Sequence, residues 1–276
     1  SLGHQVLCLR RISSKSMFDS VVESKIEWIN IEDSKLKDKV SWFQPDVLFH
    51  AAWGGVRGNG REDGNVQNEN LAMSRRMFEL YPYKQIIVIG SQAEYGFYYG
   101  PVDENHALRP TMEYGRAKKQ CCDDLKKYCE SKDLEWQWIR IFTVFGEQQT
   151  GGLIKLAIDK CKEGDKKFDT TEGNQRYSYL YAVDFAKALC QMLGAKGKSG
   201  IYNLSQPMEV HSNRYVLERI KEKMHSDIRF NFGAIPYVDD QIMLMDGTVD
   251  KFVRAFGAIP HTDFELALNK TIESFK

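Results

Sequence analysis

Short apolar runs that alternate with amphipathic segments are the feature of this 276-residue chain that most restricts its fold. Segments with apolar residues at helical spacing separate the runs, and the two clearest cover residues 65–80 and 111–131. Because neighbouring parallel strands need a crossover connection, this alternation predicts an α/β fold with a doubly wound parallel sheet. The runs suited to buried strands are residues 5–10 (QVLCLR), 26–29, 46–50 (DVLFH), 85–90 (QIIVIG) and 136–142 (WQWIRIF).

The pattern becomes less regular after about residue 145. We therefore predict a parallel-sheet domain over residues 1–150 and a smaller, mixed α/β part over residues 151–276, with some interleaving. Ligands of such sheets bind beyond the carboxyl ends of the strands, so the functional site is expected where those ends meet the second part. The second part shows helical spacing at residues 152–163, 183–193, 213–224 and 264–275, and strand-like runs at residues 201–204 and 228–232.

Charge and composition exclude several classes of function. The 38 Lys and Arg residues balance the 38 Asp and Glu residues, so no global field favours a nucleic acid or an anionic membrane. The longest purely aliphatic stretch, residues 86–89, is far below the roughly 20 residues of a membrane-spanning helix. The six cysteines form no CxxC pair and have no companion histidine spacing, so we expect reduced thiols, no metal site and a cytoplasmic protein.

Tyr114 and Lys118 in the run YGRAK are the most specific candidates for chemistry. Their spacing of i and i+4 within an expected helix places both side chains on one face. An ammonium beside a phenol favours the phenolate, and a tyrosine of ordinary pKa, about 10, must be lowered by several units to act as a base near neutrality. The pair therefore fits acid–base catalysis, although a solvated helix face would give the same pattern.

Further motifs stand in a fixed order around this pair. Ser91 follows a strand-like run in GSQAEYG (residues 90–96), and DVLFHAA (residues 46–52) precedes it. RIFTVFG (residues 140–146) comes after the pair, with GIYNL and FGAIP nearer the C-terminus. In this order and spacing the motifs resemble the extended short-chain dehydrogenase/reductase family of NAD-dependent epimerases/dehydratases. The resemblance covers nearly the whole chain and implies a Rossmann-like fold with a nicotinamide cofactor.

The resemblance assigns roles to individual residues. Tyr114 would be the general acid/base, Lys118 would lower its pKa and bind the nicotinamide ribose, and Ser91 would hold the same substrate oxygen. Trp53, Gln92 and Thr143 would border the sugar. Turn capping is the alternative role for Ser91 and Asn70, and core packing is the alternative for Trp53. The further cofactor contacts that the resemblance implies are Ala51, Ala52, Asn70 and Thr143.

The segment after the first run bears on the choice of dinucleotide. An acidic residue that binds a ribose is expected there for NAD(H), but the sequence has Arg10 and Arg11, followed by Ile12 and Ser13. Two arginines with a hydroxyl can clamp a 2′-phosphate through charge-assisted hydrogen bonds, so NADP(H) is favoured, with NAD(H) as the alternative. Asn30 follows the next run, where family members hold adenine.

Departures from the family pattern narrow the reaction. Sugar 4,6-dehydratases usually carry an Asp–Glu pair where this chain has Gln92 and Ala93, and neither of these side chains can do acid–base work. Glu94 comes one position later, and we interpret it as a structural acceptor. The motifs look most like CDP-abequose or paratose synthase-type enzymes, which predicts a nucleotide-diphosphate-sugar 4-ketoreductase. The alternative is a 4-epimerase, whereas a 4,6-dehydratase or a non-catalytic dinucleotide-binding protein is disfavoured.

The remaining expectations concern the diphosphate, the assembly and the start of the fold. Arg176 lies beside Tyr177, which stands at the family's usual place for a phosphate-binding arginine, and is the candidate for that role. The family commonly dimerises through two helices, which predicts a homodimer through residues 65–80 and 111–131. The family's first strand and glycine-rich loop have no counterpart before residue 5, so we expect the native fold to start upstream.

Overall fold

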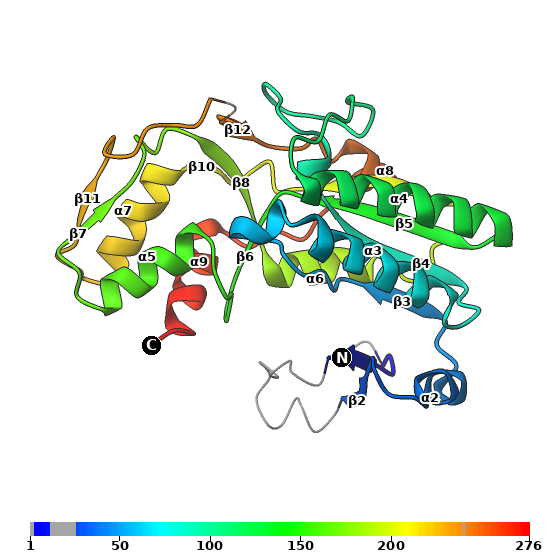
Figure 1. Ribbon diagram of the computed structural model, residues 1–276. Coiled ribbons are helices and arrows are strands. Elements are labelled where there is room, and N and C mark those ends of the chain that lie inside the picture. The colour runs from blue at the N-terminus through cyan, green and yellow to red at the C-terminus, as the bar shows by residue number, and fades with distance from the viewer. Residues whose placement is uncertain (1–2, 12–25, 240) are drawn as a thin grey trace.

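A parallel sheet forms the centre of the molecule in the computed structural model, which describes residues 3–11, 26–239 and 241–276 (Figure 1). All neighbouring strands of this sheet run parallel. The predicted α/β fold is therefore confirmed, and the expected strand ends are shifted by a residue or two. The strands lie in the order β3 (Val47–His50), β4 (Gln85–Ser91), β5 (Glu135–Ile141) and β9 (Gly200–Leu204).

Helices cover both faces of this sheet, which makes it doubly wound (Figure 1). Ile86 and Val88 of β4 pack with α3 and α4 on one face, and Ile87 and Ile89 pack with α6 and α8 on the other. Successive residues of a strand point to opposite faces, so only a continuous apolar run can fill both. The helices are α3 (Gly64–Glu79), α4 (Glu113–Lys132), α6 (Ala182–Cys190) and α8 (Asp250–Phe256).

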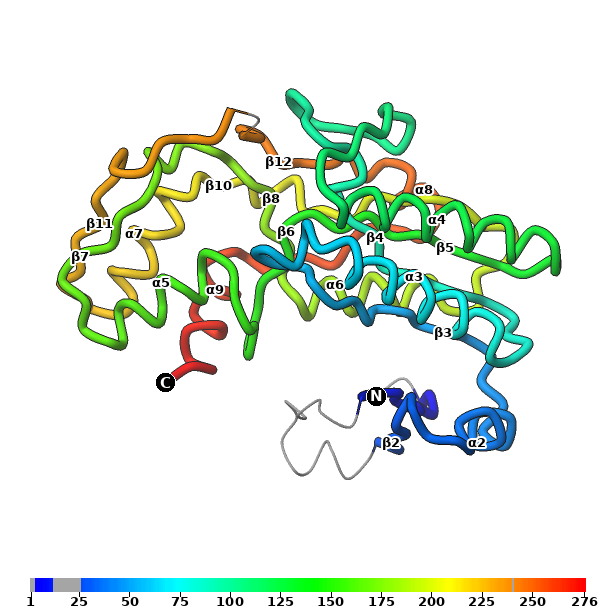
Figure 2. Tube along the Cα trace, viewed as in Figure 1, coloured from blue at the N-terminus to red at the C-terminus, as the bar shows by residue number. Residues whose placement is uncertain are grey.

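A separate pair of parallel strands lies near the N-terminus, apart from β3 (Figure 2). Ile29 and Val40 from this region pack against Met77 and Leu80 around the end of α3. Among the described residues the two strands pair only with each other, and β3 is an edge strand of the four-stranded sheet. The elements of this region are β1 (Leu7–Arg10), β2 (Glu27–Asn30) and α2 (Leu36–Phe43).

The part of the chain after β5 builds a second sheet around β8, covered by helices (Figure 1). Phe145, Leu217, Phe264 and Leu268 share its core, and the last three stand at the core positions of their predicted helices. The boundary at residue 150 stays a prediction. The strands of this sheet are β6 (Thr143–Phe145), β8 (Arg176–Tyr181), β10 (Val210–Ser212) and β12 (Leu244–Met245). A separate parallel pair consists of β7 (Lys167–Asp169) and β11 (Arg229–Asn231), and the helices of this part are α5 (Leu153–Lys162), α7 (Asn213–Lys223) and α9 (Phe264–Glu273).

Helix α4 approaches the turn after β4 so closely that position 115 must be glycine. A Cβ atom at Gly115 would lie 2.4 Å from the carbonyl oxygen of Ala93, in the short helix η2 (Gln92–Glu94). Side-chain Cβ atoms do not come that close to backbone oxygens in folded proteins. The glycine in YGRAK therefore allows the start of α4, with Tyr114, to sit beside the end of β4.

We predict that Gly115→Ala pushes α4 away from η2 and lowers the free energy of unfolding by about 1–3 kcal/mol, although alanine has the higher helix propensity. Urea denaturation checks this. Gly64→Ala is the matched control, because a Cβ at the start of α3 meets nothing within 4 Å. A Gly115→Ala variant as stable as the parent chain would contradict the close approach.

Candidate active site

Ser91, Tyr114 and Lys118 meet at the carboxyl end of β4. Ser91 is the last residue of that strand, Tyr114 lies in the first turn of α4, and Lys118 follows one turn later. All three are buried, with 8%, 9% and 4% of their surface exposed. The Ser91 side chain lies near enough to the Tyr114 phenol to lower its pKa. The structure thus brings together the three residues that the sequence analysis assigned to catalysis.

The turn after β4 holds Ser91 in place through a capping box. The Ser91 hydroxyl accepts a hydrogen bond from the backbone of Ala93 at 3.1 Å. The Glu94 carboxylate in turn accepts one from the backbone of Ser91 at 2.8 Å. The Ser91 side chain therefore caps a turn, which was the alternative role considered for it, and its role toward a substrate oxygen stays a prediction.

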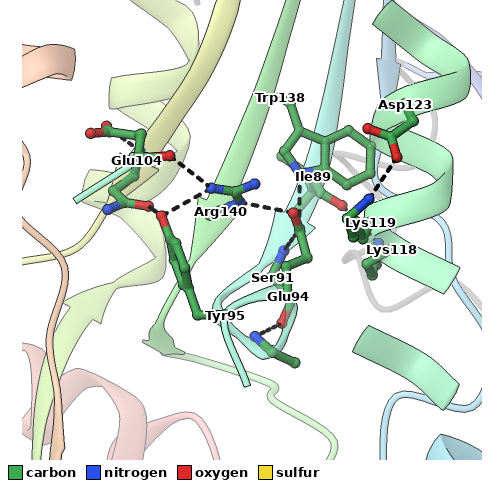
Figure 3. Close-up of polar contacts among 12 residues, drawn as sticks. Ile89, Ser91, Glu94, Tyr95, Glu104, Lys118, Lys119, Asp123, Trp138 and Arg140 are labelled. Carbon is green, nitrogen blue, oxygen red and sulfur yellow. Dashed lines mark hydrogen bonds and ion pairs between the residues drawn. The ribbon is translucent and has the colours of Figure 1, made fainter. Parts of the chain in front are cut away.

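Glu94 is also the centre of a buried polar network (Figure 3). Its carboxylate accepts hydrogen bonds from the Trp138 indole and from Arg140 Nε, both at 2.8 Å. The Glu94 side chain is 0% exposed and the Arg140 side chain is 1% exposed. Arg140 also donates to the Tyr95 hydroxyl at 3.1 Å, and that hydroxyl donates to Asn203 at 2.6 Å. Glu94 is therefore a structural acceptor, as the sequence analysis predicts.

The Lys118 ammonium points toward the sheet. Its Nζ donates a hydrogen bond to the carbonyl of Ile89 at 2.7 Å and lies 3.8 Å from the centroid of the Trp53 ring. It is 6.0 Å from the centroid of the Tyr114 ring. Burial lowers the pKa of Lys118 to about 8. The carbonyl and the aromatic face stabilise the charged form that burial penalises.

The pKa of the Tyr114 phenol is raised above its ordinary value, because burial penalises the phenolate. The Ser91 side chain and the nearby Arg61 guanidinium lower this pKa, and the Glu94 carboxylate raises it. We expected Lys118 to favour the phenolate, but its ammonium is bound to the Ile89 carbonyl instead. The i and i+4 spacing places both side chains on one face of α4 and leaves the direction of Nζ open.

The segment after β3 lines the same site. Ala51 and Ala52 are exposed at the end of the strand. Trp53 meets the Tyr114 ring edge-on, with ring centroids 6.5 Å apart, and its indole donates to Gln67 at 2.8 Å. Trp53 also packs against the core between α3, α4 and the sheet. It is therefore both a core residue and a wall of the site.

Three other residues were predicted to bind ligands, namely Asn70, Gln92 and Thr143. Asn70 pairs with both backbone groups of Gly54, at 2.8 and 2.9 Å, and so shapes the loop after β3. Gln92 accepts a hydrogen bond from the Tyr98 hydroxyl at 3.3 Å. Thr143 is half-buried at the start of β6, directly after β5. Gln92 and Thr143 therefore lie close in sequence to the strand ends that form the site.

The residues predicted to bind the adenosine half of a cofactor lie on β1 and β2. Arg10 and Asn30 are paired at the ends of these parallel strands. The Arg10 guanidinium packs 4.5 Å above the Trp28 ring, and Arg11 is exposed. The Asn30 side chain accepts a hydrogen bond in the turn that follows β2. Ser13 lies outside the described residues.

Arg176 is exposed at the first residue of β8. Within the described part of the chain its side chain makes no hydrogen bond or ion pair. The neighbouring Tyr177 is half-buried, and its hydroxyl accepts a hydrogen bond from Gln241 at 3.1 Å. Neighbouring side chains on a strand point to opposite faces, so Arg176 and Tyr177 cannot fill the same role.

Sequence reasoning missed Arg61. Its guanidinium lies 5.1 Å from the centroid of the Tyr114 ring. Arg61 ends the short helix η1 (Gly58–Arg61), whose sequence GNGR has the composition of a polar turn. The available signal was an arginine in the loop that follows a strand end, which is where sheets of this type bind ligands.

The fold and the Ser91, Tyr114 and Lys118 group define the class of nicotinamide-dependent enzymes with a Rossmann-like sheet. Residues 1–205 match the NAD dependent epimerase/dehydratase family. The chain therefore belongs to this family.

Two curated relatives show which proteins this chain is similar to. A putative UDP-glucose 4-epimerase of Methanocaldococcus jannaschii is 29% identical over 204 residues, which cover 70% of this chain and 66% of that protein. This chain thus spans just under two thirds of that relative. CDP-abequose synthase of Salmonella muenchen is 25% identical over 250 residues, which cover 87% of this chain and 80% of that protein.

Solved structures agree on the fold. UDP-glucose 4-epimerase of Thermotoga maritima, solved with UDP-glucose, has a TM-score of 0.86 and 18% identity, covering 99% of this chain and 91% of that chain. The Thermus thermophilus UDP-glucose 4-epimerase in complex with NAD has a TM-score of 0.84 and 18% identity, covering 99% and 92%. At these identities the likeness establishes the Rossmann-like fold alone.

The described residues fit the nicotinamide end of such a cofactor. Ala51 and Ala52 leave the end of β3 exposed, with side chains small enough for a ring to lie against the backbone. Lys118 Nζ carries three hydrogens, and the Ile89 carbonyl accepts from it. A buried ammonium with further N–H donors suits the hydroxyl groups of a ribose.

None of the helices in the described ranges is long and apolar enough to cross a membrane.

We predict that Arg140→Met lowers the free energy of unfolding by about 3–5 kcal/mol, because it leaves the Glu94 carboxylate buried without its charged partner. Urea denaturation measures the loss. Lys84→Met is the control, since Lys84 and Asp46 form an ion pair whose side chains are 82% and 68% exposed, and such pairs contribute about 0–1 kcal/mol. Equal effects of the two substitutions would show that the buried pair has no special weight.

Proposed function

We propose that this chain is a nucleotide-diphosphate-sugar 4-ketoreductase that uses a nicotinamide cofactor. The observation that carries the proposal is the buried group of Ser91, Tyr114 and Lys118 at the end of β4 and the start of α4. Gln92 and Ala93, which follow Ser91, offer neither the acid nor the base that a dehydration needs. Similarity to CDP-abequose synthase over 87% of the chain supports the same choice.

The catalytic residues would act on one oxygen of the sugar. When bound, the nicotinamide cofactor supplies the hydride for the carbonyl carbon C4. Tyr114 breaks its phenolic O–H bond and gives the proton to O4, so that the carbonyl becomes a hydroxyl and water later reprotonates the phenolate. Ser91 donates a hydrogen bond to O4 and stabilises the negative charge that develops there.

A 4-epimerase is the second candidate. It is supported by the similarity to the putative UDP-glucose 4-epimerase of Methanocaldococcus jannaschii. Ser91, Tyr114 and Lys118 would serve this reaction too, with Tyr114 first removing the proton from a hydroxyl at C4. The two candidates differ in their use of the cofactor, because an epimerase returns the hydride to the same sugar.

The choice of cofactor and the assembly are also proposals. We favour NADP(H), because Arg10 ends β1 beside Asn30 of β2 and is followed by the exposed Arg11, and two neighbouring guanidinium groups suit a 2′-phosphate. NAD(H) is the alternative, and the Thermus thermophilus structure contains NAD. A nucleotide-diphosphate sugar as substrate, a homodimer through α3 and α4, and a cytoplasmic location stay predictions.

We predict that Tyr114→Phe lowers kcat by about 10²–10⁴-fold, the usual contribution of general acid–base catalysis, while the chain stays folded. Steady-state kinetics with a 4-keto-6-deoxy sugar nucleotide and NADPH measures the loss. Tyr128→Phe is the matched control, because Tyr128 stands on the same helix and away from the Ser91 turn. Full turnover by Tyr114→Phe would rule out the proposed chemistry.

Absorbance of the reduced cofactor separates the two candidate reactions. A 4-ketoreductase is expected to consume one NADPH for each 4-keto-6-deoxy sugar nucleotide that it reduces, and faster with NADPH than with NADH. An epimerase is expected to convert a nucleotide sugar with a 4-hydroxyl group and to show no net consumption. Conversion of a UDP-hexose without change in cofactor absorbance would favour the epimerase.

A further inference from the structure

A second positive charge faces the phenol of Tyr114. The Arg61 guanidinium lies 5.1 Å from the centroid of the Tyr114 ring, closer than the Lys118 ammonium at 6.0 Å. The Lys118 ammonium donates a hydrogen bond to the Ile89 carbonyl and lies over the Trp53 ring. Arginine stays charged at every pH at which a protein works and stacks well on aromatic faces. Arg61 is thus the nearer and the more constant of the two cations.

The loop that carries Arg61 is fixed on both sides of this residue. On one side, the Gln67 side chain donates to the carbonyl of Gly60 at 2.7 Å. On the other side, the Glu62 carboxylate accepts from the backbone of Glu113 at 3.3 Å, at the start of α4 and next to Tyr114. These contacts join the loop to α3 and to α4. Arg61 is therefore held against Tyr114 by its neighbours in the chain.

Close packing within the loop adds to this restraint. Gly55 has a φ of +63°, and a Cβ there would lie 2.6 Å from the carbonyl oxygen of Gly60. A Cβ at Gly60 would lie 2.7 Å from the Cα of Gly55. The backbone thus folds back on itself between the two glycines. This close approach fixes the backbone position of Arg61, the residue that follows Gly60.

The Arg61 side chain has an unpaired donor. Its Nε is buried and has no hydrogen-bond partner among the described residues. Buried donors are rarely left unpaired, and the exceptions are often found at functional sites. The position of the guanidinium is therefore not explained by a structural hydrogen bond from Nε. Its contact with the Tyr114 ring is the interaction that accounts for it.

The groups around Tyr114 come from four elements. Ser91 of β4 lowers the pKa of the phenol, Glu94 of η2 brings a negative charge, and Lys118 stands one turn along the same helix. Burial and the Glu94 charge both oppose the phenolate. Arg61 is the cation that counters them, and it reaches the ring from η1.

We propose that Arg61 is a positioning residue for Tyr114. The guanidinium of Arg61, held against the Tyr114 ring, stabilises the phenolate that is left behind when the phenolic proton moves to the sugar oxygen. The proposal rests on the proposed function, in which Tyr114 gives up that proton. The O–H bond of the phenol breaks, its electron pair stays on the phenolate, and Arg61 supplies the compensating charge. Arg61 thereby sets the pH range over which Tyr114 exchanges its proton.

Two measurements test this role. The first is the pKa of Tyr114 in the cofactor-free chain, followed by NMR of ¹³C-labelled tyrosine, with Tyr114→Phe to assign the signal. Arg61→Gln is expected to raise this pKa by about one unit, the low end of the effect of a charge at this distance. Arg61→Lys is expected to restore part of the shift, because it keeps a cation in the loop.

The second measurement is the pH profile of the reductase reaction. Loss of the phenolic proton gives the alkaline limb, so Arg61→Gln is expected to move this limb to higher pH by the same amount and to lower kcat near neutrality. Arg75→Gln is the control, since Arg75 lies on α3 and its ionic partner among the described residues is Asp124 at the surface. It is expected to leave both measurements unchanged.

The outcomes distinguish the two proposals. If Arg61→Gln leaves the pKa of Tyr114 and the alkaline limb as they are in the Arg75→Gln control, the role of Arg61 is overturned while the proposed function stands. If Tyr114→Phe keeps full turnover, the proposed function fails, whatever the NMR titration shows. A loss of activity in Arg61→Gln that Arg61→Lys does not restore, with an unchanged Tyr114 pKa, also contradicts the positioning role.

Discussion

The ion pair between Glu94 and Arg140 is the interaction on which the rest of the site depends. Removing two charges from water is costly, and such a pair persists only where further hydrogen bonds satisfy both partners. Glu94 meets this condition with bonds from the Ser91 backbone and the Trp138 indole, and Arg140 with a bond to Tyr95. One carboxylate thus joins the serine turn to the central strand β5. The position of Ser91 follows from the stability of the core.

The sequence predicted the parallel sheet well, because continuous apolar runs such as residues 85–90 are typical of strands that are buried on both faces. It missed α2, α8 and several short strands of the second part, and it also missed the longer β8. Helix α2 (LKDKVSWF) buries only Leu36 and Val40, so its apolar signal is short. Strand β8 (RYSYLY) alternates tyrosines with other residues, and its neighbours β6, β10 and β12 come from distant parts of the chain. Pairing of that kind leaves no local signal.

The site could be predicted as a set of residues and only partly as an arrangement. Motif order predicted Ser91, Tyr114 and Lys118, and the structure places them together at one strand end. The direction of the Lys118 ammonium depends on the Ile89 carbonyl and the Trp53 ring, which spacing along α4 does not reveal. Arg61 was missed for the same reason, since its contact with Tyr114 joins a loop and a helix that are far apart in the sequence.

The stacking of Trp53 on Lys118 has a consequence for spectroscopy. The indole ring lies 3.8 Å from an ammonium whose pKa is lowered to about 8, so the charge beside the ring changes within an accessible pH range. The same ring touches Tyr114 at its edge. Indole emission depends on neighbouring charges, so we expect the emission of Trp53 to change as Lys118 loses its proton.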